Sequence, residues 1–158
     1  MIYPDIVAFA GVLPPNRAVC GLDLGEKTIG VAVSDPTRTI ASPLKTLPKG
    51  KFTDDTNRLF GLISERGVVA MVIGLPVNMD GTEGARCQSS RAFARNLLRL
   101  EASLIIAFWD ERMSSMAVNR VLIDEFDATR AKRAARVDQM AAGWILQGAL
   151  DRLRSVAR

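Results

Sequence analysis

The chain has 158 residues, of which 48% are hydrophobic and 24% are charged, and it contains two cysteines and no histidine. This length and composition fit one folded domain, and the missing histidine excludes Ser-His-Asp, Cys-His and His-ligated zinc chemistry. Any hydrolysis must therefore use carboxylates, lysine or a hard cation, and the net charge of +4 is compatible with a polyanionic partner such as nucleic acid.

The sequence also indicates a cytoplasmic protein. No apolar run is long enough to span a bilayer, and the segment Met1–Asp5 has an acid instead of the basic start of a signal peptide. Cys20 and Cys87 have neither metal-ligand spacing nor a disulfide pattern. We therefore expect a reducing compartment and no membrane contact.

The first sixteen residues differ in pattern from the rest of the chain. They are apolar but have no period, and they contain Pro4, Pro14 and Pro15. This pattern predicts a mobile extension at the surface. A single domain is then expected over residues 17–158.

Three β-type runs follow, over residues 17–23, 28–34 and 39–47. Consecutive runs of this kind favour an antiparallel meander, and Pro43 places the third run at an edge of the sheet. The first run ends in Asp23 at a tight turn, so its carboxylate is expected at the rim of the sheet, where it can meet a cation or a ligand. An ordinary hairpin with a solvated aspartate is the alternative.

The remaining chain alternates between helical and β-type patterns. Helices are predicted over residues 52–66, 85–100, 114–123 and 132–153, and apolar strands over residues 68–73 and 104–109. Such apolar strands are typical of a sheet covered on both faces. We predict an α/β fold, in which helices flank both faces of a five-stranded mixed sheet and the first, fourth and fifth strands are parallel and central.

Two features could contact phosphate groups. Residues 74–84 form a long polar turn before a helix, and a helix N-terminus attracts phosphate through its free amides. In the helix that follows, Arg91, Arg95 and Arg99 recur every four residues and form one exposed stripe. A solvated helix face is one interpretation of this stripe, and a nucleic-acid contact is the other.

Acidic residues follow two of the predicted parallel strands. Asp23 ends the first, Asp110 and Glu111 follow the last, and the final helix can bring Asp138 to the same edge. Carboxylates so close together favour a neutralising cation, and oxygen ligands without histidine suit Mg²⁺ or Mn²⁺. Two such ions about 4 Å apart can activate a water for attack on a phosphodiester. The alternative is that Asp110 or Glu111 forms an ion pair with Arg112 or Arg136.

Four segments together are similar to one known family. They are Gly21-Leu22-Asp23-Leu24-Gly25 with residues 30–35, residues 74–84, the triplet Asp110-Glu111-Arg112, and residues 137–142 with 145–147. The chain resembles the YqgF family of RNase H-like proteins, described as Holliday junction resolvases and as pre-16S rRNA nucleases. The order and spacing agree from Arg17 to Asp151. Ser114, Ser115 and Ala149 depart from the family pattern, but none of them is an acid.

The resemblance implies an RNase H-like fold and Mg²⁺-dependent cleavage of nucleic acid. By position, Asp23 would be the metal ligand on the first strand and Asp138 the ligand on the last helix. The acid after the fifth strand would be Glu111 or its neighbour Asp110, and the resemblance favours Glu111. The candidates for phosphate contacts are Lys27, Asn78 and Arg112.

The resemblance leaves three functions open. The favoured one is an endonuclease that processes the 5′ end of pre-16S rRNA, with the ribosome or its proteins as further partners. A resolvase of four-way DNA junctions shares the same chemistry and would act as a symmetric dimer. The third is an RNA-binding module without catalysis. The sequence fits either a monomer or a homodimer.

Overall fold

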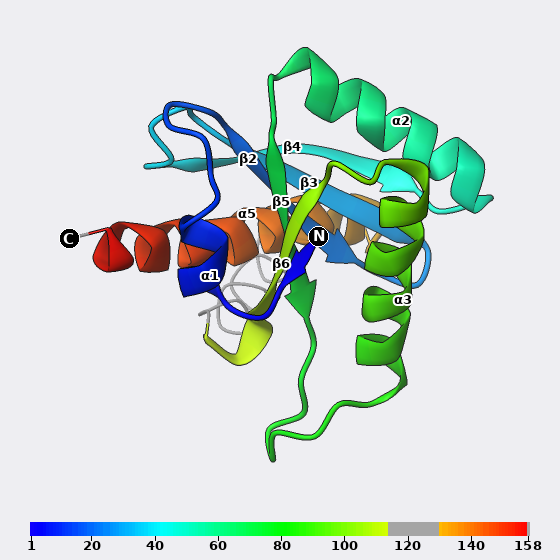
Figure 1. Ribbon diagram of the computed structural model, residues 1–158. Coiled ribbons are helices and arrows are strands. Elements are labelled where there is room, and N and C mark those ends of the chain that lie inside the picture. Colours follow the sequence, from blue (N-terminus) through cyan, green and yellow to red (C-terminus); the bar gives the residue numbers. More distant parts are fainter. Residues whose placement is uncertain (114–129, 158) are drawn as a thin grey trace.

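The computed structural model describes residues 1–113 and 130–157, with the backbone alone for residues 130–139. These residues form a six-stranded sheet in the order β1-β6-β5-β2-β3-β4 (Figure 1). The strands are β1 Ile2–Tyr3, β2 Val19–Leu24, β3 Thr28–Ser34, β4 Ala41–Pro48, β5 Ala70–Leu75 and β6 Ile105–Asp110. The helices are α1 Ile6–Ala10, α2 Phe52–Glu65, α3 Ala85–Leu100 and α5 Arg130–Val156, and the 3₁₀ turn η1 spans Glu111–Met113.

The sheet confirms the predicted mixed topology. Strands β2, β3 and β4 form an antiparallel meander, whereas β2, β5 and β6 are parallel and central. Strand β4 is at an edge, as Pro43 predicted, and the β3–β4 register shifts next to this proline. Helices α1 and α5 cover one face and α2 and α3 cover the other, so the expected layers are also confirmed.

The prediction of a mobile extension is wrong for the first ten residues. Strand β1 pairs in parallel with β6, and α1 packs through the buried side chains of Ile6 and Phe9. Asp5 caps α1 by accepting a hydrogen bond of 2.8 Å from the amide of Ala8. The sheet therefore has six strands and not five. A two-residue strand and a five-residue helix are too short to show a hydrophobic period, which is why the sequence pattern missed them.

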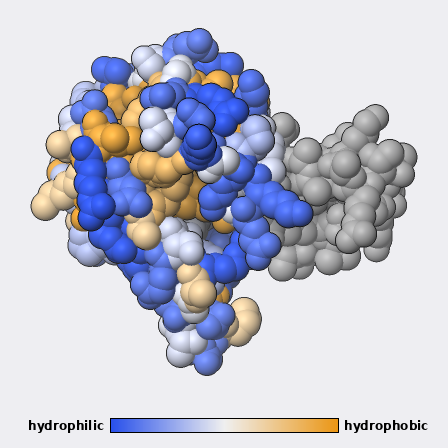
Figure 2. All heavy atoms as spheres, turned by 90° about the vertical axis from the view of Figure 1, so that its right-hand side faces the viewer, coloured by the Kyte–Doolittle hydropathy of each residue, from blue (hydrophilic) through white to orange (hydrophobic). Residues whose placement is uncertain are grey.

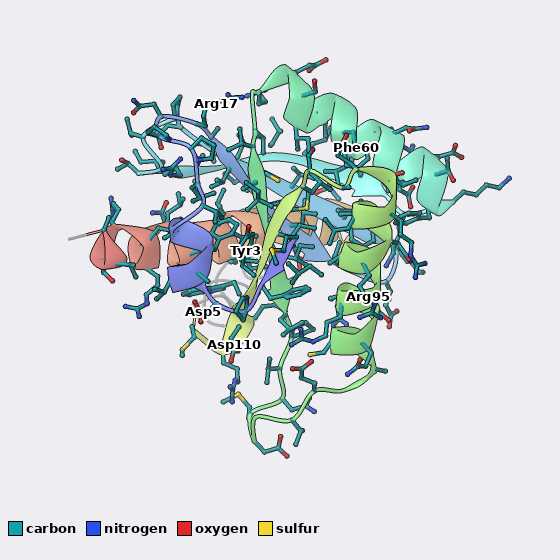
Figure 3. The ribbon with its side chains drawn as sticks, in the orientation of Figure 1. Tyr3, Asp5, Arg17, Phe60, Arg95 and Asp110 are labelled. Atoms are coloured by element: carbon teal, nitrogen blue, oxygen red, sulfur yellow. The ribbon has the colours of Figure 1, made fainter. Side chains whose placement is uncertain are left out.

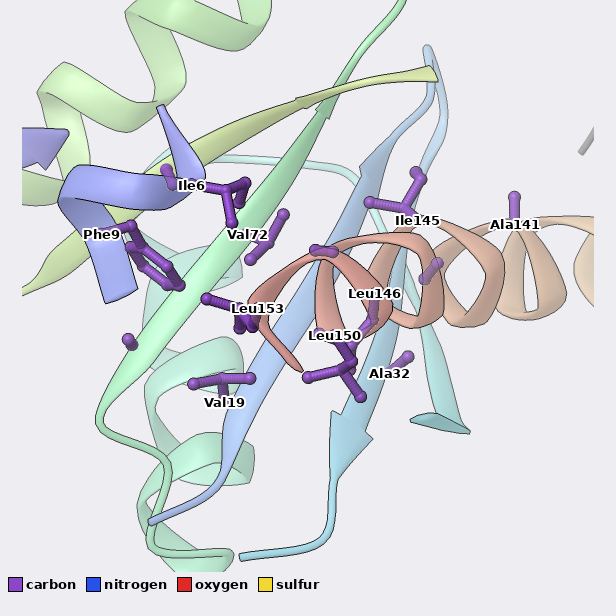
Figure 4. Packing of buried hydrophobic residues seen from close by; sticks show 14 residues of the cluster. Ile6, Phe9, Val19, Ala32, Val72, Ala141, Ile145, Leu146, Leu150 and Leu153 are labelled. Carbon is purple, nitrogen blue, oxygen red and sulfur yellow. The ribbon is translucent and has the colours of Figure 1, made fainter. Parts of the chain in front are cut away.

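Helix α5 is the main support of its face of the sheet. Its side chains Ile145, Leu146 and Leu150 are fully buried against β2, β3 and α1 (Figure 4). Gln147 fastens the helix to the β3–β4 hairpin, because its side chain accepts from the amide of Ala41 at 2.9 Å and donates to a hairpin carbonyl at 3.1 Å. The position of α5 over the sheet is therefore set by both apolar packing and hydrogen bonds.

The predicted helices agree with the structure wherever it describes them. Helices α2 and α3 match the predictions over residues 52–66 and 85–100, and α5 is somewhat longer than the predicted 132–153. The helix predicted over residues 114–123 lies outside the described residues. None of the described helices is long and apolar enough to cross a membrane.

The turn between β3 and β4 is organised by Asp35. Its carboxylate accepts bonds of 2.8 Å from the backbone amides of Thr39 and Ile40, and a further bond from the hydroxyl of Thr37. These bonds, the one from Ile40 above all, lower the pKa of Asp35 from 3.8 to about 2. The charged carboxylate is thus favoured in the folded chain.

We expect Asp35→Asn to lower the free energy of unfolding at neutral pH by up to about 1 kcal/mol, because the charged acceptor is lost at a partly solvated site. Since the folded pKa is depressed, the contribution of Asp35 is complete above pH 4 and disappears as the pH falls towards 2. Urea unfolding at pH 7, 5 and 3 measures the difference between the two proteins. A difference that does not change with pH would contradict this assignment.

Candidate active site

Asp23 lies near the carboxyl end of β2 on the face that α5 covers. The side chains of a strand alternate between faces, and Gly21, two residues earlier, contacts α5. A Cβ atom on Gly21 would lie 2.7 Å from Cβ of Leu146 and 3.0 Å from the carbonyl oxygen of Ala142. Asp23 itself is 7% exposed. A largely buried carboxylate at the carboxyl end of a central strand is unusual and indicates a functional role.

Glu111 lies on this same face, although it comes from the turn η1 after β6. Its Cδ atom is 3.4 Å from the position that a Cβ of Gly74 would take, and Cδ1 of Ile145 on α5 is 2.4 Å from that position. Gly74 follows Ile73, the partner of Leu22, and so is next to Asp23 across the parallel pair β2–β5. The two acids therefore flank Gly74, and the missing side chain of this glycine leaves room between them.

Asp110 points to the other face of the sheet. Its neighbour Trp109 packs against Gly148 of α5, so alternation along β6 directs Asp110 away from that helix. Arg112 binds the Asp110 carboxylate through Nε at 3.0 and 3.1 Å, Nη2 at 2.7 Å and its backbone amide at 2.9 Å. The hydrogen bonds from Arg112 hold the pKa of Asp110 below its usual value. Figure 3 shows Asp110 at the lower end of β6.

Asp110 and Arg112 thus form the ion pair that the sequence left as an alternative. Arg112 also donates from Nη1 to the carbonyl oxygen of Met79 at 3.4 Å, so it joins the end of β6 to the loop before α3. Its pKa is raised by the hydrogen bond to Asp110. The guanidinium of Arg112 already donates hydrogen bonds to the Asp110 carboxylate. The phosphate contact predicted for Arg112 stays a prediction.

Asp138 lies on α5, one turn before Ala142. The helix crosses β2 with Ala142 and Leu146 against Gly21, the residue two places before Asp23. The backbone of Asp138 is described, but its side chain lies outside the described residues. Within the described side chains there is no group of three acids, cysteines or histidines that could hold a metal ion.

The described acids still have the composition of a site for a hard cation. Asp23 and Glu111 offer oxygen ligands on one face, and the chain has no histidine. Carboxylates flanking the same glycine carry like charges, which a divalent cation would neutralise. The donor set therefore fits Mg²⁺ or Mn²⁺ better than zinc.

The loop over residues 76–84 is braced by its own side chains and extends from the carboxyl-end edge of the sheet (Figure 1). The carboxylate of Asp80 accepts from the amide of Thr82 at 2.9 Å and from its hydroxyl at 2.6 Å. These bonds from Thr82 lower the pKa of Asp80. Asn78 donates one amide hydrogen to the Thr82 hydroxyl at 3.0 Å, so its other amide hydrogen is the one that a phosphate could use.

The remaining predicted contacts differ in exposure. Lys27 is an exposed residue of the β2–β3 turn, close in sequence to Asp23. Arg91 forms a bidentate ion pair with Glu83, at 2.7 and 2.8 Å, and its guanidinium lies 4.9 Å from the ring centroid of Phe108. Arg95, labelled on α3 in Figure 3, is exposed. The members of the arginine stripe therefore differ: Arg91 forms an ion pair within the protein, whereas Arg95 is exposed to solvent.

Sequence reasoning missed two cations beside the site. Arg86 lies in the first turn of α3, and Lys49 follows β4. Both contact the backbone at the end of β2, through bonds to Leu24 and Gly25. Arg86 could have been found from its place just after the polar loop, but nothing in the sequence brings Lys49 to this edge.

A family model and relatives similar in sequence point to the same family of nucleases. The RuvX family, described as Holliday junction resolvase, matches residues 17–152. The chain is 65% identical to a protein of Phenylobacterium zucineum (strain HLK1) over 99% of this chain and the whole of that protein. It is also 65% identical to one of Caulobacter vibrioides (strain NA1000 / CB15N), over 96% of this chain and 97% of that protein. Both are named "Putative pre-16S rRNA nuclease".

Two solved structures share the fold at low sequence identity. RuvC of T. thermophilus in complex with a Holliday junction substrate aligns with a TM-score of 0.56 and 11% identity, over 89% of this chain and 97% of that one. The yeast mitochondrial Holliday junction resolvase Ydc2 aligns with a TM-score of 0.57 and 13% identity, over 96% and 85% of the two chains. The expected RNase H-like fold is confirmed.

Proposed function

Because this chain belongs to the RuvX family, which is also called YqgF, we propose that it is a metal-dependent endonuclease that processes the 5′ end of pre-16S rRNA in the cytoplasm. The observation that carries the proposal is the pair Asp23 and Glu111, which flank Gly74 on the face covered by α5. The pre-16S substrate is supported by the names of relatives that are 65% identical over nearly the whole chain.

We assign Asp23, Glu111 and Asp138 as the residues that would hold Mg²⁺ or Mn²⁺. Asp23 and Glu111 come from neighbouring places at the carboxyl ends of parallel strands, where ligands bind in open α/β sheets. Asp138 precedes by one turn the residue of α5 that packs on Gly21. When bound, the ions would supply an activated water and neutralise charge on the phosphate.

The protein's own residues would orient the substrate. Burial of Asp23 and the packing of α5 keep the strand acid in one position, which reduces the reorganisation needed during the reaction. Lys27 is exposed at the turn beyond Asp23 and would pair with a phosphate beside the scissile bond. The spare amide hydrogen of Asn78 would donate to a second phosphate.

Asp110 has a positioning role in this proposal. It holds Arg112, and Arg112 holds the loop over residues 76–84 through the carbonyl of Met79. Asp110 therefore helps to hold the loop that carries Asn78. Its side chain lies on the face of the sheet opposite to Asp23 and Glu111. This separation distinguishes it from Glu111, although the two acids are adjacent in the sequence.

Resolution of four-way DNA junctions is the second candidate, and the description of the matching family favours it. The two functions need the same acids and differ in the substrate. A resolvase makes paired cuts and would need a symmetric dimer. A non-catalytic RNA-binding role is the remaining alternative, and ribosomal partners belong to the first proposal.

A cleavage assay on two labelled substrates tests the proposal. A pre-16S rRNA leader fragment and a four-way DNA junction are incubated with Mg²⁺, with Mn²⁺ or with EDTA. We expect metal-dependent cutting of the RNA. Paired cuts in the junction alone would support the resolvase, and tight RNA binding without any cutting would overturn the nuclease proposal for the isolated chain.

The two neighbouring acids should respond differently to loss of charge. We expect Glu111→Gln to reduce cleavage about 10²–10³-fold, because a ligand that stabilises the transition state indirectly through the cation is lost. We expect Asp110→Asn to reduce it less than about 10-fold, because Asp110 acts on the loop through Arg112 and is not one of the proposed cation ligands. Single-turnover rates at saturating Mg²⁺ measure both effects. Equal losses in the two variants would contradict the assignment.

A further inference from the structure

A pocket of about 440 Å³ lies beside the β2–β3 turn, on the face of the sheet opposite α5. Its floor is apolar and is formed by Leu24, Phe52, Ala92 and Phe93. The rings of Phe52 and Phe93 meet edge to face, with centroids 5.6 Å apart and an interplanar angle of 86°. Figure 2 looks at this side of the molecule and shows orange surface bordered by blue side chains. An apolar floor with a hydrophilic border is typical of a ligand site.

The mouth of the pocket is positively charged. Lys49 donates from Nζ to the carbonyl oxygen of Gly25 at 3.1 Å, and Arg86 donates from Nη2 to that of Leu24 at 3.5 Å. Within the described part of the chain, neither cation is one of the partners in an ion pair with a carboxylate. Among the described residues that line the pocket, Glu26, which is exposed, is the one acid. Lys49 and Arg86 therefore have donors left for an anion.

The pocket also contains neutral polar groups. Asn96 and the exposed Ser89 line it, together with the buried Ser90. The side-chain oxygen of Asn96 accepts a bond of 3.0 Å from Arg99, which orients the amide. An amide and a hydroxyl near an apolar floor can bond to the edge of a nucleobase.

The pocket is continuous with the proposed catalytic edge. Leu24 of its floor directly follows Asp23, and consecutive Cα atoms are about 3.8 Å apart. Alternation along β2 places Asp23 on the α5 face and Leu24 on the pocket face. A nucleic-acid strand that crosses the end of β2 at Asp23 can thus reach the pocket around the turn at Gly25.

We propose that this pocket binds one unpaired nucleotide of the nucleic-acid substrate, adjacent to the scissile phosphate. The base packs on Phe52 and Phe93, and its phosphate pairs with Lys49 and Arg86. A base within a duplex cannot enter a pocket of this size, whereas an unstacked base can. The inference rests on the proposed nuclease function and adds to it a preference for substrates with a single-stranded segment next to the cleavage site.

Charge reversal at the mouth tests this site. The double variant Lys49→Glu and Arg86→Glu is compared with Arg66→Glu, which makes one such charge reversal at an exposed position after α2. Affinity is measured in EDTA, so that no cleavage occurs, for an RNA hairpin with a single-stranded overhang and for a blunt RNA duplex. Circular dichroism confirms that each variant is folded.

We expect the double variant to bind the overhang hairpin at least about 10-fold more weakly and the blunt duplex almost as well as the unchanged protein. Arg66→Glu should leave both affinities unchanged. Unchanged affinity of the double variant, or equal losses for both RNAs, would overturn the proposal. A 5-iodouridine in the overhang should crosslink to the peptide that carries Phe52 or Phe93, and crosslinks only to other peptides would also overturn it.

The two proposals fail separately in these experiments. If the unchanged protein cuts RNA while the double variant binds and cuts equally well, the nuclease stands and the nucleotide pocket is overturned. If the unchanged protein cuts neither substrate but the double variant loses its affinity for the overhang hairpin, the pocket stands and the nuclease proposal fails.

Discussion

Asp23→Asn should abolish metal-dependent cleavage, with a rate at least about 10³-fold below that of the unchanged protein. Asp23 is 7% exposed and lies on the same face as Glu111, so its carboxylate would bind the cation that stabilises the developing charge on the phosphate. Asparagine has nearly the same shape but carries no charge. The packing around residue 23 should therefore be retained while cation binding is lost.

Thermal unfolding separates a lost ligand from a damaged fold. A cation that binds only the folded protein stabilises it by about 2.7 kcal/mol at a concentration 100 times its Kd. We expect Mg²⁺ to raise the Tm of the unchanged protein and of the control Asp54→Asn, which changes an exposed acid on α2. The Tm of Asp23→Asn should not respond to Mg²⁺. A normal Mg²⁺ response together with normal cleavage would exclude Asp23 as a ligand.

Gly21→Ala should destabilise the fold by about 1–3 kcal/mol, although it adds a single methyl group. The new Cβ atom would lie 2.7 Å from Cβ of Leu146 and 3.0 Å from the carbonyl oxygen of Ala142. Neither atom is the flexible end of a side chain, so α5 itself must move away from β2. Because α5 carries Asp138, we also expect slower cleavage at temperatures where the variant remains folded.

A second glycine provides a matched control for this prediction. Gly61 lies in the middle of α2, and a Cβ atom there would have no neighbour within 4 Å. Gly61→Ala should increase the free energy of unfolding by about 0.5–1 kcal/mol, because alanine favours the helix. Urea unfolding of both variants measures the contrast. Equal stability of Gly21→Ala and the unchanged protein would show that α5 does not pack tightly on β2.

The long elements of this protein could be predicted from local pattern. Strand β3 and helix α3 have the predicted bounds, because hydrophobic periods of two and of 3.6 residues continue over several turns or pairs. Pro43 correctly predicted an edge strand, since proline lacks the amide that an inner strand would need. Strand β1 and helix α1 were missed because elements of two and five residues contain little more than one period, which is too short for a pattern to repeat.

The positions of the acidic side chains show more clearly what the local sequence pattern cannot predict. The sequence alone determined which acids follow the strands and that no histidine accompanies them, because residue type and order are read directly from the chain. Only the tertiary structure decided that Glu111 lies over Gly74 while Asp110 pairs with Arg112 on the other face. Strand alternation ends where β6 passes into a 3₁₀ turn, so the direction of the next side chain depends on the path of the backbone. The nucleotide pocket has the same origin, because Lys49 and Arg86 are far apart in the chain and meet only when β4 and α3 are placed at the end of β2.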